Sequence, residues 1–402
     1  MAKRKQPSRV LIRSQVVAFR LDSHNLATRL SPGSLLPAAA ACGIQNTPPG
    51  SATLALHARV SELTPADVDR ALEIEKTLLQ VWSMRASPHV VPTGNAAVFT
   101  LGLLPGDEES LRFFIRGAGP ALDKVGISAT EAVERTAAAL PKVLDGHALT
   151  KDQLGIEIAK RVAQQLTSQQ LAGWQSPSWY APDQRLGEAI VRFALSIVAL
   201  QGLLCVAPRK GRAATFIRTE WWLGAPLPEM SREQARAELV RRYLHCYGPS
   251  TAAHFAEWAG IAPTQSAQSW RLVEHELIEV DFEGRRAWLH ESDLPRLASP
   301  ATPAGIRFLP PHEPYLQLRD RATLVPDKAL RRHLWRSSGN PGVILVDGRF
   351  VATWRPRKTG QRLKLAVELF TSVSQKMRSQ IEMEAATLAP YRRCRAVEVE
   401  FR

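Results

Sequence analysis

The stretch that decides the fold runs from Ser231 to Leu289 and reads SREQARAELVRRYLHCYGPSTAAHFAEWAGIAPTQSAQSWRLVEHELIEVDFEGRRAWL. Its first four residues have the spacing of a capping box, in which Ser231 and Gln234 each accept a hydrogen bond from the other's backbone N–H. Apolar residues then recur at steps of three and four as far as Tyr247. This spacing predicts an amphipathic helix that Gly248-Pro249 ends.

Two shorter helices and a hairpin follow in the same stretch. The second helix ends at Gly260, the third covers about 264–275, and residues 277–289 form two short apolar runs around the turn Glu283-Gly284. Three helices followed by a hairpin are the order of a winged helix, a helix-turn-helix variant that usually docks on DNA. The alternative is a scaffold that holds another protein.

Composition favours a polyanionic partner. The chain has 402 residues, with 52 Lys and Arg against 38 Asp and Glu, so its net charge is +14 and its isoelectric point is near 10.0. Such an excess indicates nucleic acid before membrane. The most apolar run, 193–207, contains Gln201 and is too short to span a bilayer, and no signal peptide fits the N-terminus. We therefore expect a cytoplasmic, nucleoid-associated protein.

The cysteines predict neither a disulfide framework nor a zinc site, because no CxxC pair occurs. They are Cys42, Cys205, Cys246 and Cys394. We expect each to be a reduced, buried, small hydrophobe. His245 and Cys246 with His254 lack a second thiolate, which favours core packing over a metal. No metal and no cofactor are therefore expected.

The pattern of helices followed by a hairpin occurs elsewhere in the chain. The first hundred residues end in strands at about 77–82 and 89–91, and a helix at 187–200 precedes a hairpin with a basic tip. From residue 301 onward, 19 Lys and Arg stand against 9 Asp and Glu. This last part predicts a three-stranded meander around the two turns Asp347-Gly348 and Arg355-Pro-Arg-Lys-Thr-Gly360.

The predicted fold class is therefore α+β, with tandem winged-helix modules and a C-terminal antiparallel β-rich region. We expect a first winged helix in 1–120, linker helices and a second winged helix in 121–225, a third in 226–300, and a basic β-rich region in 301–402. The capping-box spacing of Ser128 with Glu131 and of Thr150 with Gln153 predicts the linker helices at about 129–144 and 151–166.

Basic residues gather at the predicted hairpin tips, where wings reach DNA phosphates. The predicted DNA contacts are Arg209, Lys210, Arg212, Arg285, Arg286, Arg355, Arg357 and Lys358. The run 349–364 has six basic residues and no acidic one. The alternative is that these tips are solvated turns without a partner.

Several segments together resemble the winged-helix DNA glycosylases of the AlkZ/YcaQ type. They are Gly43-Ile-Gln-Asn-Thr-Pro-Pro-Gly-Ser-Ala52 with Leu56 and Arg59, Tyr247-Gly-Pro-Ser-Thr-Ala-Ala-His-Phe-Ala-Glu-Trp-Ala-Gly260, Arg307-Phe-Leu-Pro-Pro-His-Glu-Pro-Tyr315, and Asn340-Pro-Gly-Val-Ile-Leu-Val-Asp-Gly348 through Thr353-Trp354. The resemblance implies a concave face that binds double-stranded DNA. It also implies monofunctional, metal-free hydrolysis of the N-glycosidic bond of alkylated or crosslinked purines, in base-excision repair.

The family's catalytic motif is Gln, any residue, then Gln or Asp. By resemblance, Gln45 takes its first position, Asn46 the middle one, and Thr47 stands where Gln or Asp is expected. An N7-alkylated purine is a cationic leaving group, so the enzyme must chiefly align a water and stabilise an oxocarbenium-like sugar. Gln45 can hold the water, whereas the Thr47 hydroxyl cannot act as a base near neutral pH.

Three alternatives stay open at this point. Gln45 and Thr47 can be turn residues that fix a loop rich in Gly and Pro. The chain can also be a non-catalytic DNA-binding protein, either a regulator or a lesion binder, or a scaffold.

Glu313 stands where the family more often has Asp, and we expect it to pair with an Arg. A monomer is expected.

Overall fold

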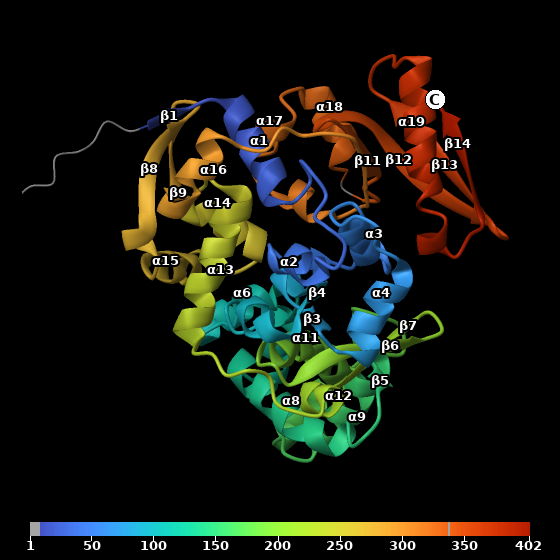
Figure 1. Cartoon of the computed structure of the whole chain (residues 1–402). Helices are drawn as coiled ribbons and strands as arrows, with labels where there is room; N and C mark the ends of the chain where they lie inside the picture. Colours follow the sequence, from blue (N-terminus) through green and yellow to red (C-terminus); the bar gives the residue numbers. More distant parts are fainter. Residues whose placement is uncertain (1–8, 337) are drawn as a thin grey trace, which may run out of the picture. The chain divides into compact units, whose positions relative to one another are not determined.

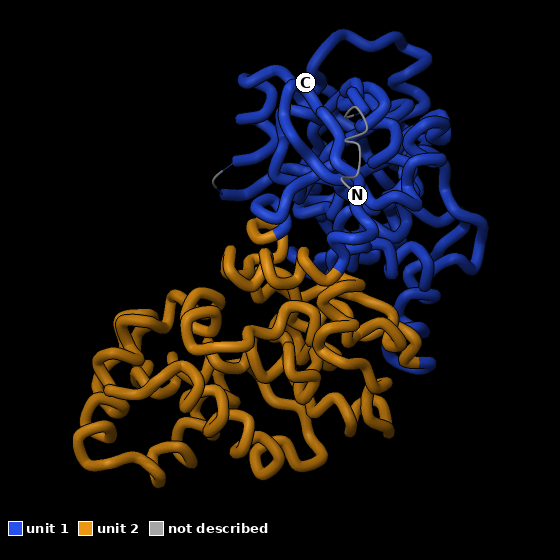
Figure 2. The backbone as a smooth tube through the Cα atoms, turned by 90° about the vertical axis from the view of Figure 1, so that its left-hand side faces the viewer, with its two compact units in different colours: residues 1–75, 240–255, 273–402 blue, residues 76–239, 256–272 orange. Residues whose placement is uncertain are grey.

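The computed structural model describes residues 9–336 and 338–402, which divide into two compact units (Figure 2). Unit 1 comprises residues 1–75, 240–255 and 273–402, and unit 2 comprises residues 76–239 and 256–272. Both units combine helices with small β-sheets (Figure 1), so the predicted α+β class is confirmed. The tandem winged-helix arrangement and the division into four domains stay predictions.

Unit 1 is built on two sheets. Its helices are α1 (Arg13–Ser23), α2 (Leu35–Ala40), α3 (Ser51–His57), α4 (Pro65–Asp69), α16 (Leu294–Ala298), α17 (Arg321–Leu324), α18 (Lys328–Leu334) and α19 (Gln375–Ala386). Its strands are β1 (Arg9–Leu11), β2 (Ile44–Gln45), β8 (Leu277–Phe282), β9 (Arg285–His290), β10 (Ile306–Leu309), β11 (Gly342–Val346), β12 (Arg349–Thr359), β13 (Arg362–Leu369) and β14 (Ala396–Phe401).

Unit 2 is mainly helical. Its helices are α5 (Ala96–Phe99), α6 (Glu108–Phe114), α7 (Gly119–Val125), α8 (Ala129–Val143), α9 (Lys151–Ala163), α10 (Ser168–Trp174), α11 (Leu186–Leu200), α12 (Thr219–Leu223) and α15 (Pro263–Arg271). Its strands are β3 (Leu78–Trp82), β4 (Pro88–Pro92), β5 (Leu149–Thr150), β6 (Leu204–Lys210) and β7 (Ala213–Arg218). Helices α13 (Arg232–Tyr247) and α14 (Ala252–Ala259) contribute residues to both units.

The stretch 231–290 has the predicted order of elements, α13, α14, α15, β8 and β9. The capping box is confirmed, because the backbone N–H groups of Ser231 and Gln234 donate to the opposite side chains at 3.0 and 3.1 Å. Strands β8 and β9 pair antiparallel around Glu283-Gly284. In unit 1, β1 adds to β8 in parallel, and Val16 and Phe19 of α1 pack against this sheet.

A five-stranded sheet in the order β10-β11-β12-β13-β14 forms the second half of unit 1. The predicted Asp347-Gly348 turn joins β11 to β12, and Gly348 takes a left-handed backbone with φ of 75°. Helix α19 lies along the sheet (Figure 1), with Ile381 in a core that also contains Trp354. A side chain at Gly342 would place its Cβ 2.3 Å from the Trp354 ring. This close approach explains the glycine.

The sequence analysis expected an antiparallel C-terminal region. The structure differs from this expectation at one pair of strands. Strand β14 runs parallel to β13, with Arg362 opposite Ala396. A parallel neighbour needs a long connection, which a hairpin turn cannot provide, and α19 supplies it between β13 and β14.

The predicted turn at 355–360 is also wrong. Strand β12 continues to Thr359, so Arg355, Arg357 and Lys358 lie within a strand, and the turn is Gly360-Gln361. Pro356 suggested a turn because proline cannot donate to a sheet. Strand β11 pairs with β12 only as far as Trp354, so at Pro356 strand β12 has a neighbour on one side only, which is β13. The missing N–H group of Pro356 therefore costs the sheet little stability.

Unit 2 confirms the predicted capped helices near 129–144 and 151–166. Ser128 Oγ accepts the N–H of Glu131 at 3.0 Å at the start of α8, and Thr150 and Gln153 form a capping box at α9. Helices α8, α9 and α11 pack against one another, and α11 is buried on nearly all sides. In the described part of the chain, every helix is too short or too polar to cross a membrane.

Candidate functional site

Gln45 lies in β2, at the start of the loop that leads to α3 in unit 1. Its side chain is 5% exposed and is held by a side chain from a distant part of the sequence. The amide Nε2 of Gln317 donates to Gln45 Oε1 at 2.7 Å and to the carbonyl oxygen of His312 at 2.8 Å. The orientation of the Gln45 amide is therefore fixed by Gln317, which the sequence analysis did not identify.

Gln317 ends the short 3₁₀ helix Pro314–Gln317, and a buried ion pair holds the start of that helix. Arg59 and Glu313 are 0% and 1% exposed, and the Arg59 Nη2 donates to Glu313 Oε1. The other carboxylate oxygen of Glu313 accepts the N–H of Tyr315 at 2.6 Å. The predicted pairing of Glu313 with an arginine is confirmed.

The same ion pair connects both sides of the Gln45 loop. Arg59 Nη1 donates to the carbonyl oxygen of Ala55 in α3, at 2.9 Å, so the guanidinium is fixed to the helix that follows the loop. Its other end holds Glu313 and thereby the segment that carries Gln317. Arg59 and Glu313 therefore position Gln45 indirectly, through α3 and through the segment that carries Gln317.

The two residues after Gln45 differ in their environment. Asn46 Oδ1 accepts the backbone N–H groups of Gly50 and Ala52, at 2.8 and 3.2 Å, which closes the loop and satisfies a donor at the N-terminus of α3. Thr47 is half-buried, and its hydroxyl has no hydrogen bond within the described residues. Asn46 therefore shapes the loop, whereas the Thr47 hydroxyl is available to a ligand.

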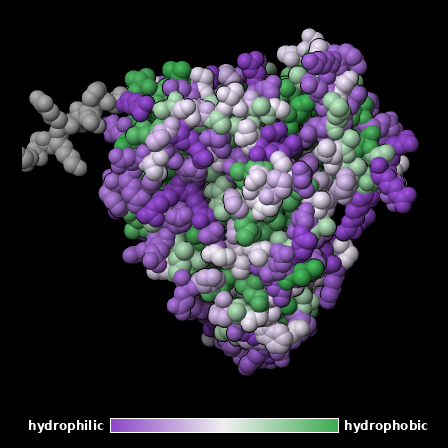
Figure 3. Space-filling view, viewed as in Figure 1, coloured by the Kyte–Doolittle hydropathy of each residue, from purple (hydrophilic) through white to green (hydrophobic). Residues whose placement is uncertain are grey.

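The predicted cations of unit 1 are all exposed, and their present partners differ. Arg355 and Lys358 on β12 donate to the backbone carbonyl oxygens of residues 339, 392 and 393. Arg286 on β9 pairs with Glu279 at 3.2 Å. In the described part of the chain, Arg285 and Arg357 have no hydrogen bond or ion pair. On the face shown in Figure 3, hydrophilic residues cover the tip of the β12–β13 ribbon, at the right edge.

The remaining predicted cations lie in unit 2, at the end of the β6–β7 hairpin. Arg209 and Lys210 belong to β6, and Arg212 follows in the turn. All three are exposed. Arg209 donates to the carbonyl oxygen of Arg212, and Lys210 donates to that of Ala148 at 3.3 Å.

A basic cavity of about 770 Å³ opens beside the β8–β9 hairpin in unit 1. Two predicted cations, Arg285 and Arg286, line it. The sequence analysis missed the other basic residues on its wall, which are Arg319, Arg321, Lys328, Arg331 and Arg332. Two acidic residues, Glu283 and Asp320, stand among them. The lining therefore carries an excess of positive charge, which favours an anionic ligand.

One of the two acidic groups is neutralised by the fold. Arg20, 1% exposed, donates to the carbonyl oxygens of Gly248 and Pro249 and pairs with Asp320 at 2.8 Å. Burial alone would raise the pKa of the Asp320 carboxyl, but Arg20 and the Thr323 hydroxyl lower it below its ordinary value. Asp320 is thus ionised and paired with Arg20, so its charge is balanced within the fold.

The basic cavity and the Gln45 site share one segment. Gln317, which holds Gln45, is two residues before Arg319 in the cavity wall. Trp335 also lines the cavity, and its indole Nε1 donates to the carbonyl oxygen of Leu316 at 2.8 Å. Sequence spacing gave no signal for Gln317, whereas the cations from 319 to 332 were visible as a run with few acidic residues. A second cavity of about 780 Å³, in unit 2, contains none of the predicted site residues.

Comparison with known proteins gives a consistent result. The chain is 26% identical over 350 residues to an interstrand DNA cross-link repair glycosylase from Streptomyces sahachiroi, a match that covers 85% of this chain and 86% of the relative. The solved structure of the Streptomyces sahachiroi DNA glycosylase AlkZ superposes with a TM-score of 0.72 at 23% identity, covering 98% of this chain and 100% of that one, and so has the same fold. The family model described as DNA glycosylase AlkZ-like matches residues 38–391. Because this match spans most of the sequence, including the Gln45 loop and strands β10 to β13 of the five-stranded sheet, the chain belongs to the AlkZ-like DNA glycosylase family.

Proposed function

We propose that this chain hydrolyses the N-glycosidic bond of N7-alkylated or crosslinked purines in double-stranded DNA, in base-excision repair, with no metal ion taking part in the reaction. Membership of the AlkZ-like family supports a hydrolase acting on N-glycosyl bonds of DNA. The relative named as an interstrand cross-link repair glycosylase supports bulky or crosslinked adducts as the substrate class.

The reaction asks little acid catalysis of the protein. A purine alkylated at N7 already carries a positive charge and leaves as a neutral base, so the enzyme must chiefly place a water against the sugar and stabilise the cation that forms there. The Oε1 of Gln45 can accept a hydrogen bond from that water. Its partial negative charge also stabilises an oxocarbenium-like sugar.

The observation that carries this proposal is the hydrogen bond from Gln317 to Gln45 Oε1, at 2.7 Å. An amide carbonyl oxygen can accept two hydrogen bonds, so the bond from Gln317 does not by itself exclude a second one from a water. The bond fixes the amide before substrate arrives, and a group that is already oriented does not have to reorganise during the reaction. Thr47, whose hydroxyl has no partner in the described residues, can give the same water a second hydrogen bond.

DNA binding by the basic residues supports the same proposal. Residues of the basic cavity wall follow directly in sequence on the segment that holds Gln45. A DNA strand whose phosphates bind in the cavity would therefore run near the Gln45 loop. The exposed cations of the β8–β9, β12–β13 and β6–β7 hairpins supply further phosphate contacts. We expect the winged-helix modules to present these hairpins, and a monomer to act on chromosomal DNA in the cytoplasm, at the nucleoid.

The test is release of N7-methylguanine from duplex DNA, measured as abasic sites. Gln45→Ala should reduce the single-turnover rate by on the order of 10²-fold, because it removes the oriented acceptor. Its affinity for DNA should stay unchanged, since Gln45 is not a phosphate contact. Gln169→Ala makes the same chemical change on the exposed face of α10 and should leave both quantities unchanged.

The outcomes separate catalysis from binding. A wild-type protein that binds DNA but releases no base above the uncatalysed background would favour the non-catalytic lesion binder or regulator. Release by the wild type that Gln45→Ala leaves unaltered would move the catalytic role to another residue. A complementary assay with a crosslinked duplex decides whether bulky adducts are preferred.

A further inference from the structure

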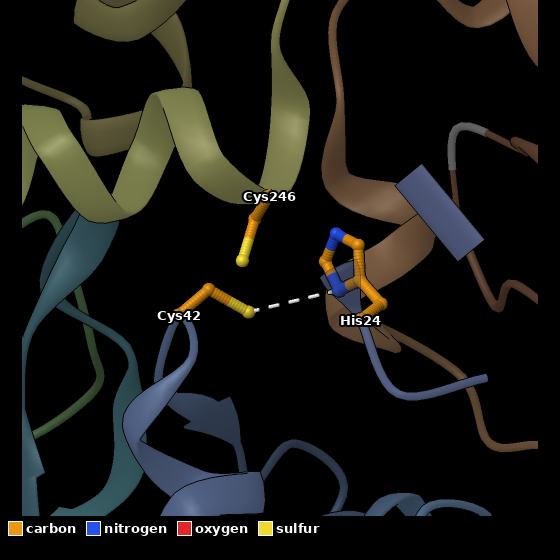
Figure 4. Close-up of side chains that lie close together, drawn as sticks. All are labelled: His24, Cys42 and Cys246. Carbon is orange, nitrogen blue, oxygen red and sulfur yellow. Dashed lines mark hydrogen bonds between the residues drawn. The ribbon is translucent and has the colours of Figure 1, made fainter. Parts of the chain in front are cut away.

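Three side chains with metal-binding atoms meet in the interior of unit 1. His24 follows α1, Cys42 lies between α2 and β2, and Cys246 belongs to α13. They are 0%, 1% and 0% exposed. Figure 4 shows the two sulfur atoms facing the edge of the imidazole that carries its nitrogens. The sequence gave no sign of this cluster, because 204 residues separate Cys42 from Cys246.

The separations suit a small cation. Cys42 Sγ lies 3.8 Å from His24 Nδ1, and all three potential ligand atoms lie within 4.8 Å of one another. Tetrahedral zinc, with bonds of about 2.3 Å to sulfur and 2.0–2.1 Å to nitrogen, requires sulfur–nitrogen separations of roughly 3.6 Å and sulfur–sulfur separations of roughly 3.8 Å. The cluster therefore needs to contract by roughly an ångström at its widest point.

The hydrogen bonding of the cluster is incomplete without a ligand. His24 Nε2 is buried and has no hydrogen-bond partner among the described residues. Its ring is fixed by edge contacts with Tyr247 and Tyr315, at centroid distances of 4.9 and 5.4 Å. A buried imidazole that only packs would normally have both nitrogens satisfied. The imidazole is thus fixed in place with one of its two nitrogens unpartnered in the described part of the chain, and a zinc ion binds a single ring nitrogen.

The charges also suit a divalent cation. Two thiolates, a neutral imidazole and a divalent ion together carry no net charge, and a buried site tolerates a neutral cluster best. The thiol protons leave to solvent when the ion binds.

We propose that His24, Cys42 and Cys246 bind one thiophilic d¹⁰ cation, Zn²⁺, as a structural ion. Two thiolates and an imidazole are the donors that zinc prefers. The carbonyl oxygen of Ala41, which accepts a hydrogen bond from Cys246 Sγ at 3.4 Å, lies beside the cluster on the side of one sulfur. It is a candidate for the fourth ligand.

The ion would join three segments of unit 1 that are far apart in sequence. It ties the end of α1 and helix α13 to Cys42, three residues before Gln45. Its role is to hold the start of the Gln45 loop, and it takes no part in the chemistry. The inference does not depend on the proposed reaction, because metal content and spectra are measured without any substrate.

The experiment uses the full chain, purified under a phosphine reductant that does not bind zinc. Zinc is counted by elemental analysis, and Co²⁺ is then added to the metal-stripped protein as a spectroscopic substitute. Thiolate ligands give Co²⁺ a charge-transfer band in the near ultraviolet that nitrogen and oxygen ligands do not give. The variants are Cys42→Ala and Cys246→Ala. Cys205→Ala, which removes an equally buried thiol in unit 2, is the matched control.

We expect about one zinc per chain and a thiolate–cobalt band in the wild type and in Cys205→Ala, with both lost in Cys42→Ala and Cys246→Ala. Removing zinc should also lower the melting temperature of the wild type but not that of either cluster variant. A wild-type protein with only traces of zinc and no cobalt band overturns the proposal, whether or not the variants fold. A Cys42–Cys246 disulfide found by mass spectrometry in chain isolated separately without reductant overturns it as well.

Discussion

Thr47 is the residue at which this chain departs from the family's catalytic motif, and its environment shows what the departure leaves open. The side chain is half-buried, and its hydroxyl has no hydrogen bond within the described residues, so a ligand rather than the fold would satisfy it. The hydrogen bonds that close the loop are accepted by the side chain of Asn46 and not by that of Thr47.

A carboxylate at position 47 should therefore increase activity. Thr47→Asp supplies the base that the family motif has there, and we expect the rate of N7-methylguanine release at neutral pH to rise at least about 10-fold. Asn has the shape of Asp without its charge, so Thr47→Asn should release N7-methylguanine no faster than the wild type. Single-turnover rates of the three proteins decide, and equal rates for Asp and Thr would mean that position 47 does not touch the water.

The Arg59–Glu313 pair should be expensive to break. Removing the charge of one partner leaves the other buried without compensation, which typically costs about 3–5 kcal/mol. We expect Glu313→Gln to lower the free energy of unfolding by about this amount and to reduce glycosylase activity, because Gln317 loses its support. The measurement is chemical denaturation followed by fluorescence.

The control for this prediction is the same substitution in an exposed pair. Glu400 pairs with Arg402 at 3.0 Å, and both side chains are about 60% exposed. Glu400→Gln should change the free energy of unfolding by less than about 1 kcal/mol. Similar losses in the two variants would show that burial does not set the strength of the Arg59–Glu313 pair.

At the scale of elements, the β12–β13 ribbon is the clearest test of phosphate binding. Arg357 is exposed near its tip and has no partner in the described residues, whereas Lys364 on the opposite strand already pairs with Glu398 at 3.2 Å. Arg357→Ala should weaken binding to all duplexes alike and reduce the slope of log K against log salt by about 0.9. Lys364→Ala should change the slope less. An unaltered slope in Arg357→Ala would mean that the tip of the ribbon is solvated and does not contact DNA.

Much of the element order was predictable, because capping and turn chemistry are local. The Ser231–Gln234 and Thr150–Gln153 boxes and the Asp347-Gly348 turn all occur where the sequence indicated. The length of β12 was not predictable, since beyond Trp354 both of its faces are exposed and no alternation marks the strand. The parallel position of β14 depends on where α19 packs, which is a long-range property.

The candidate site was predictable only in part, for the same reason. Gln45 was identified by family resemblance, and the exposed cations by their charge. Gln317 is 272 residues from Gln45, and its role follows from the Arg59–Glu313 ion pair that places its segment. The cysteine cluster likewise unites residues that no spacing rule connects.

At the scale of the whole molecule, each unit contains a histidine that resists protonation, the half-buried His57 in unit 1 and the buried His89 in unit 2. Burial, with Arg29 contributing, lowers the pKa of His57 in unit 1 from 6.5 to about 4. Burial, with Arg85 contributing, lowers that of His89 in unit 2 to about 3. Below pH 6.5 the unfolded chain therefore binds protons that the folded chain excludes, and the free energy of unfolding falls as the pH falls.

The pH window follows from these values. Each histidine reduces stability by up to about 1.4 kcal/mol per pH unit, beginning near pH 6.5 and ending near pH 4 for His57 and near pH 3 for His89. We expect His89→Gln to flatten the loss of stability between about pH 6 and pH 4, even if it lowers stability at pH 7. His147→Gln, a change at an exposed histidine, should keep the wild-type slope. Unfolding curves from pH 7 to pH 4 measure the slopes, and a wild-type slope in His89→Gln would mean that His89 is protonated in the folded chain.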